Sequence, residues 1–232
     1  MLSEARTVSL LVELIHIPTK QPFDKLREVY NQVSATCGYD NCIRISNGAR
    51  IERGGGEGDE VSTMTFLHDR IQMVEDNLTL SVEQVGRKLV ALLQKAMPLL
   101  NIPFFLVQQY TVRAIATPNT FKNSSEFIGR SLFRIRDEDV VVLGRPTNIF
   151  GLRLVFPPTK NHQQNFNVRI ESYTRDPQSV YIENVGMFKT PIEFQRLEVL
   201  QQSLEATSEF LTGNVCRFLS QYDRREASDH SG

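Results

Sequence analysis

The feature that most restricts the fold of this chain is an order of elements that occurs twice. In the first half, a strand through Val12-Glu13 ends at Pro18-Thr19 and leads to a helix. In the second half, a strand through Val112-Arg113 ends at Pro118-Asn119 and does the same. Antiparallel strands and an amphipathic helix follow each time. The repetition predicts an α+β fold with two similar strand–helix–strands–helix halves related by a pseudo-two-fold axis.

The two halves set the expected boundaries. Residues 1–101 form the first half and residues 102–223 the second, within one compact domain, and residues 224–232 form a flexible polar tail. The same order of elements also arises by chance in α+β chains, so the duplication is a hypothesis. It equates Glu13 with Arg113, Glu75 with Glu183, and Ser81 with Thr190.

Two long amphipathic helices are predicted. One begins at Thr190, with Pro191 in its first turn and Glu193 at the capping-box position. Its apolar residues recur at three- and four-residue steps for about eight turns, and Gly213 inside it bends or weakens it. The other begins at Ser81, with Gln84 at the capping-box position, and ends at Pro98. Shorter helices are expected over residues 23–33 and after the capping residue Asn123.

Alternation of apolar and polar residues predicts the strands. Phe166–Glu171 alternates as a strand does when one sheet face is covered and the other is in water. Further strands are expected over residues 42–46, 61–67, 140–143, 149–156 and 180–183. We therefore expect an antiparallel sheet covered on one side by the helices that begin at Ser81 and Thr190.

Composition excludes several classes of protein. The chain has 232 residues, enough to bury a core unaided, and a formal net charge of −1, which argues against a general nucleic-acid binder. Cys37, Cys42 and Cys216 contain no CxxC pair and fit a reducing compartment. The apolar run Val8–Ile17 is interrupted by Glu13, so neither a signal peptide nor a membrane span is expected. We expect a cytoplasmic protein.

Familiar site motifs are incomplete. The run Gly54–Gly58 joins two expected strands, and no Lys-Ser or Lys-Thr follows it, so a mobile hairpin loop explains it better than a phosphate loop. The histidines are scattered, and we expect neither a metal nor a cofactor. The acidic cluster Asp137–Asp139 could bind a cation but is better explained as a solvated turn.

Three arginines form the leading candidate binding feature. Arg113, Arg153 and Arg169 each lie between apolar neighbours in the middle of an expected strand. If these strands are adjacent, the guanidinium groups form a row on one sheet face and could bind an anionic ligand or an acidic partner. Alternatively, the three arginines form ordinary cross-strand ion pairs with acids such as Glu171, Glu183 or Glu13.

The second half combines a basic strand Tyr110–Ala116, a β-meander, the strand Val180–Glu183 ending in an acid, and a long helix ending near Phe218. In this order of elements it resembles a sporadically distributed family of uncharacterised bacterial proteins. The family has no assigned activity, so the resemblance implies no catalytic residues.

Two hypotheses for function remain. The first is a non-enzymatic binding or assembly module that associates with itself, as a homodimer for example, or with another protein, because a long amphipathic helix can support association. The alternative is a sensor or an enzyme for a small anionic molecule held over Arg113, Arg153 and Arg169. Membrane and nucleic-acid partners are not expected.

Overall fold

The computed structural model describes residues 2–54, 60–145, 147 and 149–223. The first half contains β1 (Arg6–Ile15), α1 (Phe23–Cys37), β2 (Asn41–Ile45), β3 (Gly48–Arg53), β4 (Val61–Leu67), β5 (Arg70–Asp76) and α2 (Val82–Leu100). The second half begins with β6 (Phe104–Phe105), β7 (Val107–Ala116), α3 (Ser124–Glu126), the π-helical turn η1 (Phe127–Leu132) and α4 (Asp137–Val141). It continues with β8 (Gly151–Phe156), β9 (Asn165–Ser172), β10 (Val180–Phe188), β11 (Ile192–Glu193), the 3-10 turn η2 (Phe194–Arg196), α5 (Glu198–Glu209), the π-helical segment η3 (Phe210–Val215) and α6 (Cys216–Ser220).

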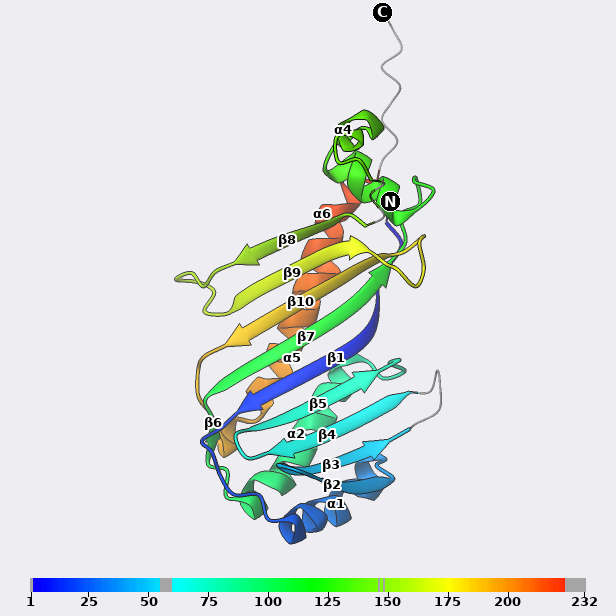
Figure 1. Ribbon diagram of the computed structural model, residues 1–232. Helices are drawn as coiled ribbons and strands as arrows, with labels where there is room; N and C mark the ends of the chain where they lie inside the picture. The colour runs from blue at the N-terminus through cyan, green and yellow to red at the C-terminus, as the bar shows by residue number, and fades with distance from the viewer. Residues whose placement is uncertain (1, 55–59, 146, 148, 224–232) are drawn as a thin grey trace, which may run out of the picture.

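The described strands build one large antiparallel sheet and a small one. The large sheet has nine strands in the order β2-β3-β4-β5-β1-β7-β10-β9-β8, and β6 pairs with β11 in a separate two-stranded sheet. Helices α1, α2, α5 and α6 all lie behind the large sheet in Figure 1, and its front face carries no helix in the described part of the chain. The predicted α+β fold with an antiparallel sheet covered by helices is therefore confirmed. We call the uncovered side of the sheet the open face.

Alternation along the strands separates the two faces. In β1, Leu10, Val12 and Leu14 are buried against the helices, whereas Leu11 and Glu13 on the open face are half-buried. Helix α5 packs on β7 and β10, α1 packs on β2 and β3, and α2 lies between the two helices. The core is continuous along the whole helix-covered face.

The sheet extends in both directions from the central pair of β1 and β7. On one side follow β5, β4, β3 and β2, and on the other β10, β9 and β8. If Glu13 is equated with Arg113, the register equates Gln72 with Glu183, because Gln72 lies opposite Glu13 and Glu183 lies opposite Arg113. Glu75 is three residues further along β5 and faces the helices, so its expected equivalence with Glu183 is wrong. The internal duplication, with its boundaries at 101 and 102, stays a prediction.

The helix expected from Thr190 begins later. Ile192 and Glu193 pair with Phe105 and Phe104, and a 3-10 turn follows before α5 starts at Glu198 without a side-chain cap. The local capping pattern was therefore misleading, because tertiary strand pairing holds this segment extended. Gly213, which was expected to bend or weaken the long helix, lies within the π-helical segment η3.

Other local predictions had mixed outcomes. Ser81 forms the expected capping box with Gln84, and Asn123 caps α3, but α2 continues past Pro98 to Leu100. Residues 140–143 form no strand, because Val140 and Val141 end the short helix α4 and a turn follows. The loop prediction at 54–58 and the tail prediction at 224–232 lie mostly or entirely outside the described residues.

Candidate binding surfaces

The predicted arginine row lies on the open face, with an acid inside it. Arg153 on β8 lies directly opposite Arg169 on β9, and Arg169 lies opposite Glu183 on β10. Glu183 in turn lies opposite Arg113 on β7. Residues directly opposite each other share a sheet face, so all four side chains project to the same side. The strand of Arg113 is separated from that of Arg169 by β10.

Glu183 binds two of the three arginines. Arg113 Nε donates to Glu183 Oε2 over 2.9 Å, and an Arg169 nitrogen lies 3.4 Å from Glu183 Oε1. The Tyr181 hydroxyl also donates to Glu183 Oε2, over 2.9 Å. Burial opposes the charge of Arg113, but the hydrogen bond to Glu183 raises the pKa of its guanidinium above the ordinary value. These contacts match the ion-pair alternative for Arg113 and Arg169.

Arg153 differs from the other two arginines. It is exposed, and its Nε donates to the side-chain oxygen of Asn167 over 2.8 Å. Among the described residues it forms no ion pair within 4.0 Å. Arg153 is therefore the member of the row whose charge is available to a ligand.

Strand β8 forms one edge of the nine-stranded sheet, and its outer side pairs with no described strand. The backbone carbonyl of Phe150, just before β8, accepts a hydrogen bond from the backbone N–H of Ser172 at the end of β9, over 3.1 Å. The backbone groups of Phe150 therefore point toward β9. Backbone groups alternate in direction along a strand, so the N–H and C=O groups of Gly151, Arg153 and Val155 point outward. Such a row of unpaired backbone groups is a template for another strand.

An apolar groove follows the same edge on the helix side, which we call the β8 groove. It has a volume of about 390 Å³ and is lined by Leu154, Phe156, Phe210, Asn214, Val215 and Phe218. The ring of Phe156 packs edge-on against Phe210, with 5.0 Å between centroids. Val155 on the open face is 57% exposed and Phe156 is 38% exposed. The edge therefore exposes apolar side chains on both faces of β8.

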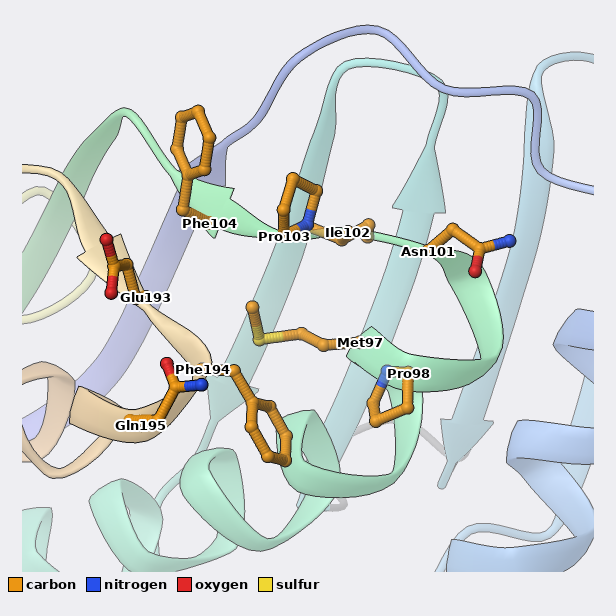
Figure 2. Close-up of a pocket in the computed structure, with 9 residues that line it drawn as sticks. All are labelled: Met97, Pro98, Asn101, Ile102, Pro103, Phe104, Glu193, Phe194 and Gln195. Carbon is orange, nitrogen blue, oxygen red and sulfur yellow. The ribbon is translucent and has the colours of Figure 1, made fainter.

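A second hollow, of about 630 Å³, lies where α2 ends (Figure 2). Figure 2 shows Met97 and Pro98 on the last turn of α2, with Phe194 on the neighbouring η2 segment. Among its described lining residues the one ionisable side chain is Glu193. The described lining therefore brings no acid–base pair and no nucleophile with its base together in this hollow.

A buried polar cluster that the sequence analysis missed lies between the sheet and α2. Lys88 Nζ donates to Ser62 Oγ over 2.6 Å and to Glu75 Oε1 over 2.8 Å. It also lies 4.7 Å from the ring centroid of Tyr39. Burial, and then the charge of Glu75, raises the pKa of Tyr39 well above its ordinary range. The sequence alone could have indicated that Glu75 is buried, because Glu75 continues the core-facing alternation of Ile71 and Met73.

The hollow beside Lys88 offers an anion no uncompensated charge from its described lining residues. It is about 460 Å³ in volume, and its lining includes Arg53, Arg87 and Lys88. Each of these cations has its own acid, at 2.8 Å in every case: Arg53 with Glu60, Arg87 with Glu83, and Lys88 with Glu75. The cluster therefore has the geometry of a buried ion pair rather than of a ligand site.

The remaining candidates contribute no further site. Within the described residues, no three His, Cys, Asp or Glu side chains converge to hold a metal ion. The thiols of Cys37, Cys42 and Cys216 are unpaired, and burial raises the pKa of each. In the acidic cluster, Asp139 binds Arg136 at 3.1 Å. No helix in the described ranges is both long enough and apolar enough to span a membrane.

Comparison with known proteins gives little. No protein-family model and no curated protein matches the chain. Among solved structures, E. coli aspartokinase III in complex with aspartate and ADP aligns at 12% identity with a TM-score of 0.19. The alignment covers 89% of this chain and 32% of the aspartokinase chain. A likeness at this TM-score carries no argument about fold or function.

Proposed function

We propose that this chain is a non-enzymatic binding or assembly module that associates with protein through the edge strand β8. The observation that supports this most is that the outer side of β8 pairs with no strand in the described part of the chain, while the backbone groups of Gly151, Arg153 and Val155 point outward. Natural proteins usually blunt a sheet edge with prolines, bulges or several charges. Strand β8 contains one charged residue, Arg153, and no proline. The pairing of β8 with β9 is continuous, without a bulge.

Strand addition at an edge supplies affinity through main-chain hydrogen bonds and specificity through side-chain pockets. The β8 groove provides such a pocket on the helix side, with Phe156, Phe210 and Phe218 in its lining. The unpaired thiols of Cys37, Cys42 and Cys216 are consistent with a reducing cytoplasmic location. A bacterial source is a further part of this proposal and depends on the family resemblance of the second half.

The test compares the full chain with Val155→Lys, which places a charge on the outer edge without touching the core. Association is measured by light scattering of the purified chain and by affinity capture at matched expression. We expect an associated species, with itself or with a defined partner, that Val155→Lys weakens. A chain that stays monomeric and captures no partner dependent on Val155 would overturn the proposal.

A second candidate function is recognition of a small anionic molecule over the arginine row, because the Arg153 guanidinium has no acid beside it among the described residues. Thermal unfolding with added phosphate and carboxylate compounds tests it, since a ligand of the native state raises the melting temperature. We expect any shift to be lost in Arg153→Ala. A flat response across such compounds contradicts this candidate.

A further inference from the structure

We infer that the partner of β8 is the β8 strand of a second copy of this chain, paired antiparallel about a two-fold axis through Leu154. This inference rests on the proposed function and names the partner and the register. It would join two nine-stranded sheets into one continuous sheet, with the helices of both copies on the same side.

The faces of the strand restrict the register. Gly151, Arg153 and Val155 project to the open face, whereas Leu154 and Phe156 line the β8 groove on the helix side. A continuous sheet requires residues that lie opposite each other to share a face. The axis must therefore pass through a residue of β8, and near the middle of the strand the choices are Arg153 and Leu154.

Charge decides between these two registers. An axis through Arg153 places Arg153 opposite its own copy, and like charges directly opposite each other are destabilising. An axis through Leu154 instead places Arg153 opposite Val155 of the second copy. Arg153 then keeps its 2.8 Å hydrogen bond to Asn167 on the open face. The Leu154 register is therefore favoured.

The backbone is consistent with the same register. The N–H and C=O groups of Arg153 and Val155 point outward, so these two residues can exchange both hydrogen bonds across the interface. Leu154, whose groups point toward β9, then meets its copy as a close pair without main-chain hydrogen bonds. All the outward groups in the middle of the strand are satisfied.

Pairing of the two β8 strands would bury side chains on both faces of the sheet. On the helix side, Leu152, Leu154 and Phe156 of each copy meet across the axis and continue into the two β8 grooves. On the open face, Val155, now 57% exposed, packs against the stem of Arg153. A formal net charge of −1 per chain means that two copies repel each other little.

Substitutions at Val155 test the register through charge. Because Val155 lies opposite Arg153 of the second copy, Val155→Lys adds a repulsion on both sides of the axis and Val155→Glu adds an attraction. We expect the dimer dissociation constants of these variants to differ by about tenfold, measured by sedimentation velocity at low salt. Ile43→Lys is the matched control, because Ile43 is an exposed apolar residue on the opposite edge strand, β2. It should leave the dissociation constant unchanged.

Disulfide trapping tests the axis directly. Leu154→Cys should form a cross-linked dimer on mild oxidation, because cross-strand Cα atoms in such a pair lie about 4.5 Å apart. Arg153→Cys should cross-link far less. Preferential trapping of Arg153→Cys, or equal effects of Lys and Glu at Val155, would overturn the Leu154 register. A monomeric chain that binds another protein in a Val155-dependent way would overturn self-pairing and leave the proposed function standing.

Discussion

Lys88 and Glu75 form an ion pair inside the protein, with 2.8 Å between Nζ and Oε1. The Lys88 side chain is 9% exposed and that of Glu75 is 1% exposed, and Ser62 donates to the same carboxylate oxygen. A buried pair of this kind contributes little net stability compared with apolar residues of similar size, because both charges have lost their water. Removing either side chain alone would nevertheless leave the other charge buried without a counter-charge.

The first prediction follows from this dependence. Lys88→Met leaves the Glu75 carboxylate buried without a counter-charge, and we expect it to lower the free energy of unfolding by about 3–5 kcal/mol. The double variant Lys88→Met/Glu75→Leu removes both charges and should recover most of that loss. Urea unfolding measures both. A single variant that is as stable as the parent chain would contradict a buried ionised pair.

The second prediction concerns Glu183, which accepts from Arg113 and Tyr181 and lies 3.4 Å from Arg169. Glu183→Gln removes the negative charge that separates two arginines, and we expect a loss of about 1–2 kcal/mol in unfolding free energy. Arg153→Ala serves as the control and should change stability by about 0.5 kcal/mol or less, since Arg153 is exposed. Equal losses in the two variants would mean that the row is held together by other contacts.

Local patterns in the sequence predicted the elements that depend on local physics. The alternation of residues 166–171 gave β9, and the capping residues Ser81 and Asn123 marked the starts of α2 and α3. The same rules failed at Thr190, where pairing of Ile192 with Phe105 holds the chain extended. That pairing joins residues far apart in the sequence, and no local capping rule contains it.

For the candidate surfaces, too, local patterns predicted some features and long-range strand pairing determined the others. Alternation alone placed Arg113, Arg153 and Arg169 on one face, because each lies between two apolar residues. The order of the strands placed Glu183 between Arg169 and Arg113, and it also made β8 an edge. Strand order depends on long-range pairing, so the sequence could offer ion pairing of the row only as an alternative to an open site, and it could not show that β8 is an edge strand.

The third prediction concerns the close approach of α5 to the sheet at Gly186 on β10. A Cβ at this position would lie 2.5 Å from Thr207 Oγ1 and 3.0 Å from Phe166 Cε1. Gly186→Ala must therefore push α5 away from β10, and we expect it to lower the free energy of unfolding by about 1–3 kcal/mol. Gly213→Ala is the matched control, because the nearest atom to its new Cβ is Glu209 Cγ at 4.0 Å. It should be neutral or slightly stabilising in urea unfolding.

The fourth prediction is a pH dependence that arises at His16. The ring is 1% exposed, its Nδ1 donates to the carbonyl of Ile17 over 2.8 Å, and burial lowers the pKa of the imidazole below 6.5. The charge of Asp69 favours the protonated ring, and His68 disfavours it, but burial has the larger effect on the pKa.

Because the folded state binds the His16 proton less readily than the unfolded chain, stability contributed by the neutral ring is present above the unfolded pKa of about 6.5. It is lost as the pH falls through the lowered folded pKa. His16→Asn keeps a donor for the Ile17 carbonyl but does not titrate in this range. We expect the melting temperature of the parent chain to fall more steeply between pH 7 and pH 5 than that of His16→Asn. Parallel curves for the two proteins would assign the acid sensitivity to other groups.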